Sequence, residues 1–392
     1  GPKPVVFVLS GSSELDYKTI RADPRNIQNR PLRRGKTGPR PGQGRAKWVQ
    51  DGLMDAVDAL NEIAFWLERD LAPTFKIQAF RKAAGIIGAL DPDEVAARAR
   101  NGRLKSMKGI GDRTFDVIRQ AVDGGVPDYL AGLRERGEQP LATGGTELRS
   151  ALRGDLHSHS DWSDGGSPIG LMADAARTLG RDYLALTDHS PSLKIANGLS
   201  AERLREQLDV VADINRDGGD FRLLAGIEVD ILEDGTLDQS PEMLDRLDIV
   251  VASVHSKLRS DRSTMTERML GAINDPHMNV LGHCTGRLLQ GSRGTRPQSE
   301  FDAGRVFAAC AENDVAVEIN SRPERQDPPD ELIRLALDAG CLFSIDSDAH
   351  APGQLDFLQY GAERAASNGV PAERIVTTWP LDRLLEWSRG GI

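Results

Sequence analysis

The spacing of apolar residues changes once along this chain, close to residue 152. Before that point, from Asp51 to about Leu133, apolar positions recur three and four residues apart, as in amphipathic helices. Asp91 followed by Pro92 and two acids predicts the start of one helix, because Asp caps a helix and Pro favours its first turn. The pattern holds no good strand candidate, so we expect a small all-α unit of four or five helices.

Beyond residue 152, short apolar runs alternate with amphipathic stretches, which predicts parallel strands joined by helices. The candidate strands are residues 152–156, 183–187, 223–228, 248–254, 279–282, 315–319 and 342–346, with another at 374–376. Seven or eight such units fit a closed barrel better than an open sheet. A barrel of this kind carries its functional residues at the carboxyl ends of its strands.

The charge of the chain is unevenly distributed. A net charge of −10 argues against nucleic acid as a partner. Residues 1–50, however, carry a net charge of +8, residues 51–142 carry −2, and residues 143–392 carry −16. The basic stretch 18–47 is too polar to bury a core. It is either a mobile arm that binds the phosphate backbone or an unselected extension.

The composition excludes several classes of protein. Apolar residues make up 39% of the chain and charged residues 28%, which is typical of soluble globular proteins. No apolar run approaches the roughly 18–20 residues of a membrane span. Cys284, Cys310 and Cys341 are an odd number at unrelated spacings, so neither a disulfide framework nor a thiolate zinc site is expected. We expect a reduced, cytoplasmic protein without a membrane partner.

Histidines and carboxylates follow the predicted strands. All seven histidines lie at or beyond residue 157, and six of them stand at strand ends. In His157-x-His159 and Asp348-x-His350 both side chains point to one face, because side chains of a strand alternate. The seventh, His277, lies in a turn and is interpreted as structural. The candidate ligands are His157, His159, Asp164, His189, Glu228, His255, His283, Asp348 and His350.

These nine side chains exceed what one metal ion can bind. Imidazole and carboxylate without thiolate suit Zn²⁺, Mn²⁺ or Fe. We therefore expect two or three divalent ions, with a bridging Glu and a bridging hydroxide that attacks phosphorus. A single buried His is usually a core residue, but six at the strand ends of one barrel indicate a metal site.

Successive segments of this region resemble the motifs of the PHP (polymerase and histidinol phosphatase) superfamily. They are DLHSHSDWSDG, LTDHS, GIEVD, ASVHS, GHCTGR, EINSRPER and SDAH, and the resemblance runs from 152 to 389. The likeness is greatest to the PHP domain attached to bacterial family-X DNA polymerases. It implies an α/β fold, a distorted (β/α)7 TIM-like barrel that holds three metal ions.

The resemblance also implies roles for individual residues. The first ion would be held by His157, His159, Glu228 and Asp348. The second would be held by Glu228, His255 and His283, and the third by Asp164, His189 and His350. Glu228 and Asp348 would then serve catalysis together with Arg287, which resembles the family's phosphate-contacting residue and which Arg322 or Arg325 would assist. Cys284, where the family usually has Pro, is interpreted as a small neutral replacement.

The helical region carries a second resemblance. The sequence LKSMKGIGDR, residues 104–113, resembles a helix-hairpin-helix whose second helix starts near Asp112. Its glycines would let a phosphate approach backbone N–H groups at a helix N-terminus. An ordinary helix–helix turn is the alternative, but FKIQAFRKAA also resembles the small N-terminal domain of family-X polymerases. The candidate contacts to the DNA backbone, independent of base sequence, are Lys105, Lys108, Gly109, Gly111 and Arg113.

We therefore expect a basic, disordered arm (1–50), a helix-hairpin-helix domain (51–136), a linker (137–151) and a PHP metallophosphoesterase barrel (152–392). So short a linker leaves no room for a polymerase palm, so a DNA polymerase is not expected. The leading hypothesis is a hydrolase, a metal-dependent phosphoesterase acting on DNA in repair. It would be a 3′–5′ exonuclease or other 3′-end processing enzyme, or would cleave at abasic sites, as relatives do. The alternatives are a histidinol-phosphate-type phosphatase and a non-catalytic DNA-binding repair scaffold.

Overall fold

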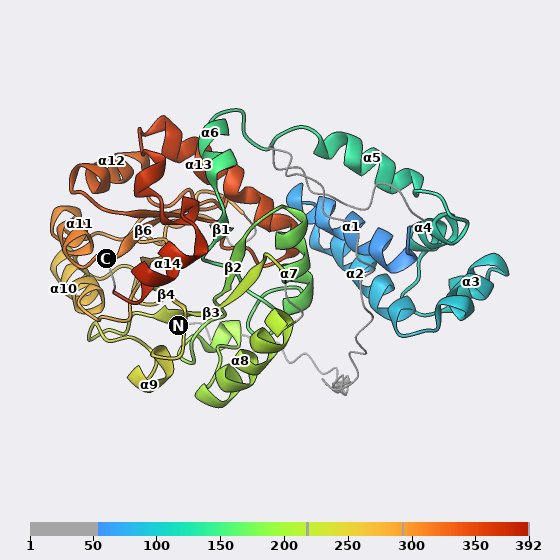
Figure 1. Ribbon diagram of the computed structural model, residues 1–392, viewed down its shortest axis with the longest axis horizontal. Coiled ribbons are helices and arrows are strands. Elements are labelled where there is room, and N and C mark those ends of the chain that lie inside the picture. The colour runs from blue at the N-terminus through green and yellow to red at the C-terminus, as the bar shows by residue number, and fades with distance from the viewer. Residues whose placement is uncertain (1–53, 217–218, 292–293, 391–392) are drawn as a thin grey trace, which may run out of the picture. The chain divides into compact units, whose positions relative to one another are not determined.

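The computed structural model describes residues 54–216, 219–291 and 294–390. The basic arm predicted at 1–50 lies outside these ranges. Within them, a helical region is followed by a barrel of parallel strands with helices around it (Figure 1). None of the helices in these ranges is both long and apolar enough to cross a membrane.

The described part of the helical region has five α-helices and one short 3-10 helix, as the apolar spacing predicted. They are α1 (Ala56–Arg69), α2 (Thr74–Gly88), α3 (Pro92–Arg100), η2 (Arg103–Ser106), α4 (Asp112–Val122) and α5 (Asp128–Gly137). α1 packs against α2, α4 and α5, and the buried side chains of Leu60 and Ile63 lie at this centre. Asp91 caps α3 as predicted, because its carboxylate accepts from the N–H of Asp93.

Seven parallel strands form the sheet, each paired with the next one along the chain. They are β1 (Gly154–Asp155), β2 (Tyr183–Leu186), β3 (Arg222–Asp230), β4 (Ile249–Ser253), β5 (Val280–Leu281), β6 (Ala316–Asn320) and β7 (Phe343–Asp346). Between β7 and β1, Ser158 forms a parallel bridge with Ala349, and the N–H of Leu156 donates to Asp346 at 2.8 Å. The barrel is therefore nearly closed, which confirms the predicted architecture.

The eighth predicted strand, 374–376, was wrong. The chain there forms two 3-10 turns, η5 (Ala372–Arg374) and η6 (Val376–Thr378), and only Ile375 makes a bridge, to Phe343 of β7. Ile375 and Val376 are fully buried, so the apolar run reflects burial against the barrel. A short apolar run cannot by itself distinguish a buried strand from a buried turn.

Helices and loops cover the outside of the barrel (Figure 1). The connecting helices are α7 (Ile169–Thr178), η3 (Lys194–Ala196), α8 (Ala201–Arg216), α9 (Pro241–Leu244), α10 (Arg262–Ile273), α11 (Ala303–Glu312), α12 (Asp330–Asp338), η4 (Pro352–Phe357), α13 (Leu358–Ser367) and α14 (Leu381–Ser388). Alternate strand residues such as Ile227 and Val229 belong to one apolar cluster with helix residues. Strand residues that point to the other face, such as Leu224 of β3 and Val251 of β4, cluster with Trp379 and Trp387. The two faces of the sheet thus have separate cores, as the alternation of a strand requires.

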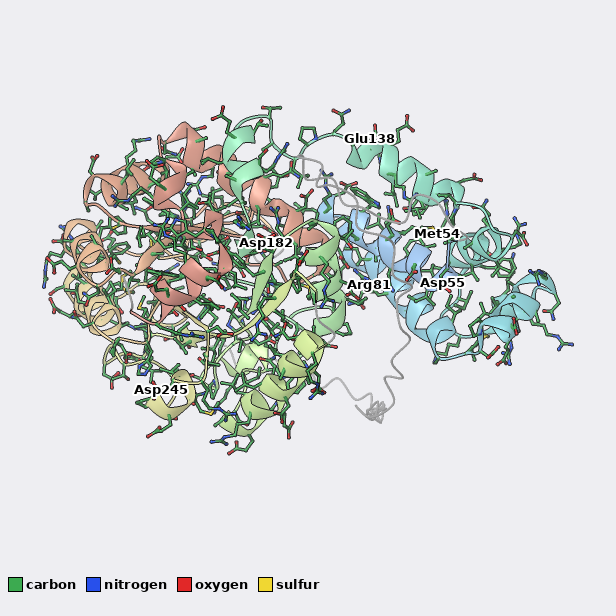
Figure 2. The ribbon with its side chains drawn as sticks, in the orientation of Figure 1. Met54, Asp55, Arg81, Glu138, Asp182 and Asp245 are labelled. Carbon is green, nitrogen blue, oxygen red and sulfur yellow. The ribbon has the colours of Figure 1, made fainter. Side chains whose placement is uncertain are left out.

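The segment predicted as a linker is held by hydrogen bonds. It contains a helix that the sequence did not predict, α6 (Thr146–Ala151). The N–H of Leu141 and the side chain of Arg149 donate to the Gln359 amide oxygen at 2.9 and 2.7 Å. After α6, Arg153 donates to Asp182 at 2.6 Å, just before β1 and β2 begin (Figure 2 labels Asp182). The chain therefore enters the barrel along a fixed path.

Candidate metal centre

The nine predicted ligands meet at the carboxyl ends of the strands, around the side chain of Glu228. Its Oε2 atom lies 3.1 Å from His157 Nε2 and 3.0 Å from His189 Nδ1. Its Oε1 atom lies 3.0 Å from His283 Nε2 and 3.3 Å from His255 Nε2. Glu228 is on β3, and the four imidazoles follow β1, β2, β5 and β4, so one carboxylate faces side chains from four other strands.

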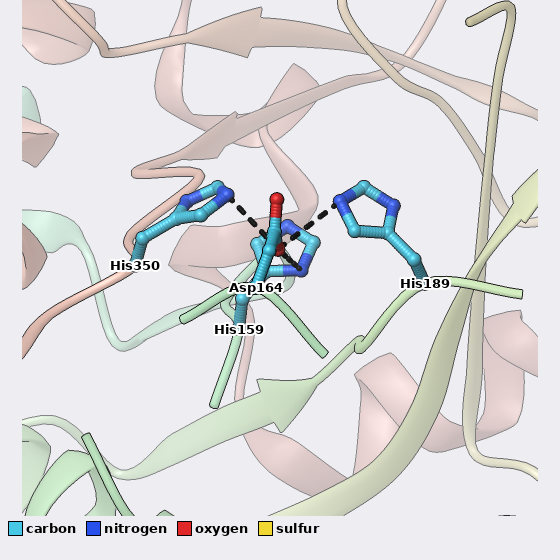
Figure 3. Close-up of side chains that lie close together, drawn as sticks. All are labelled: His159, Asp164, His189 and His350. Atoms are coloured by element: carbon cyan, nitrogen blue, oxygen red, sulfur yellow. Dashed lines mark ion pairs between the residues drawn. The ribbon is translucent and has the colours of Figure 1, made fainter. Parts of the chain in front are cut away.

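Asp164 is the centre of a second group. Its Oδ1 atom lies 3.4 Å from the Nε2 atoms of both His189 and His350, and 3.9 Å from His159 Nδ1. Figure 3 shows the three imidazole rings arranged around this carboxylate. Asp164 is partly exposed whereas His159 is fully buried, so this group lies at the open side of the cluster.

Asp348 presents one oxygen to the cluster and has the other fixed by the protein. Oδ1 lies 3.4 Å from His159 Nε2 and 3.9 Å from His157 Nε2. Oδ2 accepts from Asn320 Nδ2 at 3.1 Å and from Arg325 Nε at 3.2 Å. The backbone of Asp348 has φ of +50°, which is uncommon for a residue other than glycine. The loop after β7 thus adopts an unfavourable conformation that aims this carboxylate inward.

Three sets of candidate ligand atoms converge within 4.8 Å of one another. The sets are His159, Asp164, His189 and His350; His157, His159 and Asp348; and His189, Glu228 and His255. They overlap with the predicted groups without matching them, since His159 and His189 each belong to two sets. His283 lies in none of the three but is 3.0 Å from Glu228. The structure therefore brings all nine residues together. Besides Glu228, which was predicted to bridge two ions, His159 and His189 are each shared between two ligand sets.

Many polar atoms of this cluster are buried without any hydrogen bond. They are His157 Nε2, both ring nitrogens of His159, His189 Nδ1, His283 Nδ1 and both carboxylate oxygens of Glu228. A buried polar atom without a partner costs about 1–3 kcal/mol. Several of these atoms face one another at 3.0–3.4 Å without hydrogen-bond geometry. Imidazole and carboxylate atoms that converge in this way fit divalent cations.

The charges in the cluster depend on one another. Burial opposes ionisation of Glu228, but its imidazole neighbours hold its pKa well below the usual range. Burial would lower the pKa of His189, yet Glu228 and Asp164 raise it to about 10. Burial and two positive imidazole neighbours lower the pKa of His159 to about 3. Protons thus balance part of the carboxylate charge, and a bound cation must displace them.

Two family matches cover most of the described chain. Residues 155–322, from β1 to the end of β6, match the PHP domain. The barrel is a PHP domain. Residues 54–127, from α1 to the start of α5, match a helix-hairpin-helix domain.

The relatives of the PHP barrel differ in their named activities. The chain is 37% identical over 230 residues to the DNA polymerase/3′-5′ exonuclease PolX of Bacillus subtilis, covering 59% of this chain and 40% of that protein. It is 28% identical over 249 residues to the probable phosphatase YcdX of Escherichia coli, covering 60% of this chain and 94% of that protein. A crystal structure of histidinol phosphate phosphatase from Lactococcus lactis, with zinc, L-histidinol and phosphate, matches at 16% identity with a TM-score of 0.41 and covers 56% of this chain and 95% of that one. The chain thus spans less than half of PolX but most of the length of YcdX.

Sequence reasoning missed the carboxylates of the PHP barrel that contact the Nδ1 atoms of two ligand imidazoles, on the side away from Glu228. Glu318 lies 2.6 Å from His157 Nδ1 and accepts the backbone N–H of His283. Asp230 contacts His255 Nδ1. Such partners fix the orientation and tautomer of a ligating imidazole. Their signal in the sequence was a position at a strand end inside the GIEVD and EIN motifs.

Asp188 plays a similar part for a loop of the barrel. It is buried directly before His189 and accepts from Ser160 N–H at 2.8 Å and from the Ser160 hydroxyl at 2.6 Å. The hydroxyl of Ser163 donates to it at 2.5 Å. These bonds fix the loop that leads to Asp164, and so the position of that carboxylate.

Replacing Asp230 with asparagine is expected to weaken metal binding by roughly 10–100-fold, because His255 loses the carboxylate that orients its ring. The measurement is a calorimetric metal titration of the purified variant. Asp245→Asn is the matched control, since Asp245 (labelled in Figure 2) lies 3.1 Å from His277, outside the cluster. Equal metal affinity in the two variants would show that Asp230 has no such role.

Arg287 is bound to the loop that follows β6. Its Nε atom donates to the Arg325 carbonyl at 3.1 Å, and Nη2 donates to the next carbonyl along the chain. Arg322 and Arg325, by contrast, donate to the side chains of two cluster residues, His350 at 2.9 Å and Asp348 at 3.2 Å. The structure therefore places Arg322 and Arg325 against the ligands and Arg287 against the loop that carries them. A phosphate contact by Arg287 stays a prediction.

The thiol of Cys284 is buried beside His283. Burial, with Asp327 nearby, raises the pKa of this thiol well above its usual range. Metal ligation by cysteine requires the thiolate. The raised pKa disfavours the thiolate, and the role of Cys284 as a small neutral replacement stays a prediction.

The predicted DNA contacts lie around the hairpin between η2 and α4. Gly109 has φ of +105°, and a Cβ there would meet Ile86 at 2.6 Å, so the hairpin requires glycine. The N–H of Gly111 donates to Thr114 Oγ1 at 2.9 Å, so this amide already has a partner. Lys105, Lys108 and Arg113 are exposed around the hairpin, and so is the acidic side chain of Asp112. Lys105 lies 3.3 Å from Asp112, whereas Arg113 stacks over Tyr129.

Proposed function

We propose that this protein is a metal-dependent phosphoesterase that acts on DNA, as a 3′–5′ exonuclease or 3′-end processing enzyme or by cleavage at abasic sites, in DNA repair. The observation that carries this proposal is the presence in one chain of a PHP barrel with a His–carboxylate cluster and a helix-hairpin-helix domain. A metabolic phosphatase has no need of the second domain. The named 3′-5′ exonuclease activity of PolX supports the same reading.

The cluster would hold up to three divalent ions, Zn²⁺ or Mn²⁺, with Fe possible. When bound, such ions neutralise developing charge on a phosphoryl group and lower the pKa of water. Glu228, which faces five imidazoles, holds the ligands of different strands at one point. Glu318 and Asp230 keep two of these imidazoles oriented.

Arginines of the loop after β6 would orient the phosphate group. Arg325 is nearly fully buried, and its Nη1 atom has no hydrogen bond. Arg322 is held between Asp348 and His350, through a backbone carbonyl and a ring nitrogen. Both guanidiniums place positive charge beside the cluster without competing for its ligand positions, and Arg287 keeps their loop in place. Such fixed positive charge stabilises an anionic transition state without reorganisation.

DNA binding would begin on the helical region and not on the barrel. Residues 143–392 carry a net charge of −16, so the bound cations, and not the protein surface, would accept the scissile phosphate. Lys105, Lys108 and Arg113 are exposed around the hairpin and would contact the phosphate backbone. Contacts of this kind are independent of base sequence and weaken with salt.

A small-molecule phosphatase of the histidinol-phosphate type is the second candidate. It is favoured by the match to YcdX, which covers 94% of a protein named as a probable phosphatase. A non-catalytic DNA-binding scaffold is a weaker candidate, because nothing would then maintain nine converging donors. A cytoplasmic location also belongs to our proposal, since the three cysteines are free and buried, as in reducing compartments.

His159→Ala is expected to abolish DNA hydrolysis, with a loss of roughly 10³-fold, because His159 belongs to two of the three ligand sets. The assay uses Mn²⁺ or Zn²⁺ with single-stranded, gapped, 3′-phosphate and abasic-site DNA, alongside phosphorylated metabolites. DNA affinity, measured by fluorescence anisotropy, should stay unchanged, because the hairpin is untouched. Normal turnover by a folded, metal-depleted His159→Ala protein would refute the mechanism. Faster turnover of histidinol phosphate than of any DNA would favour the second candidate.

A further inference from the structure

Helix α1 lies directly against the segment that follows the last two candidate ligands. That segment is η4, which begins two residues after His350, and it packs against both α1 and α7. A Cβ on Gly353 of η4 would meet the Phe65 carbonyl oxygen of α1 at 2.0 Å. The two backbones are therefore in contact, with no room for a side chain between them.

A buried ion pair fixes this contact. The carboxylate of Glu68 on α1 accepts two hydrogen bonds from Arg81, both at 2.9 Å, and a third at 2.9 Å from the backbone N–H of Gly353. Glu68 is only 3% exposed, and Arg81 (labelled in Figure 2) lines a small hollow together with Pro352 and residues of α7. A buried carboxylate is stable only when it is paired and hydrogen-bonded in this way. Glu68 therefore links α1, α2 and η4.

The segment η4 is in turn connected to the ligands. The N–H of His350 donates to the side chain of Gln354 in η4 at 2.8 Å. Ala349, between Asp348 and His350, is fully buried in the same apolar cluster as Phe65 of α1. Packed interiors transmit small displacements, because they have few voids. A shift of η4 away from α1 would therefore move the two ligands beside it.

We propose that Glu68 is a positioning residue for the metal centre. Through Gly353 it holds η4, and through η4 it holds Asp348 and His350 at the distances that metal binding requires. The helical region is then part of the metal site as well as a candidate DNA-binding domain. This inference rests on the metal centre of the proposed function, but it does not depend on the substrate.

Glu68→Gln tests the inference with metal binding as the readout. Glutamine keeps the size of the side chain, but it leaves Arg81 without its counter-ion and gives Gly353 a weaker acceptor. We expect less metal bound per chain and a Kd for the weakest-bound ion raised about tenfold, as for other groups that support a ligand. Bound metal is measured by elemental analysis after dialysis, and Kd by titration with Mn²⁺ or Zn²⁺.

Glu62→Gln is the matched control. Glu62 is on the same helix, is fully buried, and also accepts two hydrogen bonds from an arginine, Arg134, at 2.6 and 2.7 Å. It also accepts from the indole N–H of Trp66 at 3.1 Å, likewise on α1, so within the described chain its hydrogen bonds stay inside the helical region. We expect Glu62→Gln to lower the melting temperature but to bind metal as the wild type does.

Gly353→Ala provides an independent test, because it separates η4 from α1 while the Glu68–Arg81 pair stays intact. It should weaken metal binding in the same direction as Glu68→Gln. The inference would be overturned if Glu68→Gln bound metal with wild-type affinity, or if Glu62→Gln lost as much metal affinity as Glu68→Gln. This comparison of the two glutamate variants is decisive even if Gly353→Ala fails to fold. If the wild-type protein bound metal but did not cleave DNA, DNA would be excluded as the substrate, whereas the positioning role of Glu68 would still hold. A wild-type protein that binds no metal would remove both.

Discussion

Replacing Glu228 with glutamine is expected to remove metal binding and hydrolysis together, lowering kcat/KM by roughly 10³-fold or more. Both oxygens of Glu228 lie within 3.4 Å of imidazole nitrogens, five rings in all. Glutamine offers one neutral oxygen and one N–H donor in the same space. Its amide therefore supplies neither the charge nor the second ligand atom that a bridging position needs. The measurements are bound metal per chain and the rate of DNA hydrolysis.

His277→Ala is the control for this variant. His277 is the one histidine of the described residues outside the cluster, and it pairs with Asp245 at 3.1 Å and Asp275 at 2.8 Å. It should keep full metal content and activity. A Glu228→Gln protein that binds metal normally and retains activity would exclude Glu228 as the shared ligand.

Metal affinity is expected to rise steeply with pH across the neutral range. The pKa of His189 is raised to about 10, and that of His157 lies well above its usual range, so both rings are protonated at pH 7. Each must lose a proton to bind a cation, which adds up to about tenfold in affinity per pH unit for each proton released. The carboxylates release none, since the pKa values of Glu228, Asp164 and Asp348 are already lowered. His159, with a pKa of about 3, also releases none.

Calorimetric titration with Mn²⁺ in buffers of different ionisation enthalpy measures this proton release directly. The stability of the metal-free protein depends on pH in the opposite direction, since it falls as pH rises. A raised pKa of His189 contributes stability that is fully present below its ordinary value of 6.5 and is lost as pH rises towards 10. Metal should therefore stabilise the fold most at alkaline pH. An affinity independent of pH between 6 and 8 would contradict the assignment of His157 and His189 as ligands.

Much of the fold was accessible from the sequence, because the barrel strands are short apolar runs bounded by polar residues. The seven runs are strands, although β1 is shorter than predicted. The N–H of Leu156 donates to the side-chain carboxylate of Asp346 on β7 and not to a backbone carbonyl, so the backbone ladder ends early. The run 374–376 showed the limit of the method, since burial alone produces the same pattern. Helix α6 was missed because six residues are too few for a helical period.

The residues of the candidate site could likewise be predicted only in part. The ligands could be predicted because each stands at a strand end, where the topology gathers side chains from all strands. Their supporting carboxylates could not, because a carboxylate at a strand end can be a ligand or a partner. Glu318 meets His157 from another strand, 161 residues away. The contact between Glu68 and Gly353 spans 285 residues and follows no local pattern at all.

The cluster takes its first ligand from the beginning of the barrel and its last from the end. His157 follows β1 and His350 follows β7, and these two ends of the sheet are joined by the bridge between Ser158 and Ala349 and by hydrogen bonds such as that from the N–H of Leu156 to Asp346. A chain emerging from the ribosome therefore cannot complete the centre until its final strand is in place. Metal binding to the two ligand sets that include Asp348 or His350 therefore adds its free energy only to the completed barrel. The ions held by these two sets would thus stabilise the finished barrel relative to forms that lack its last strand.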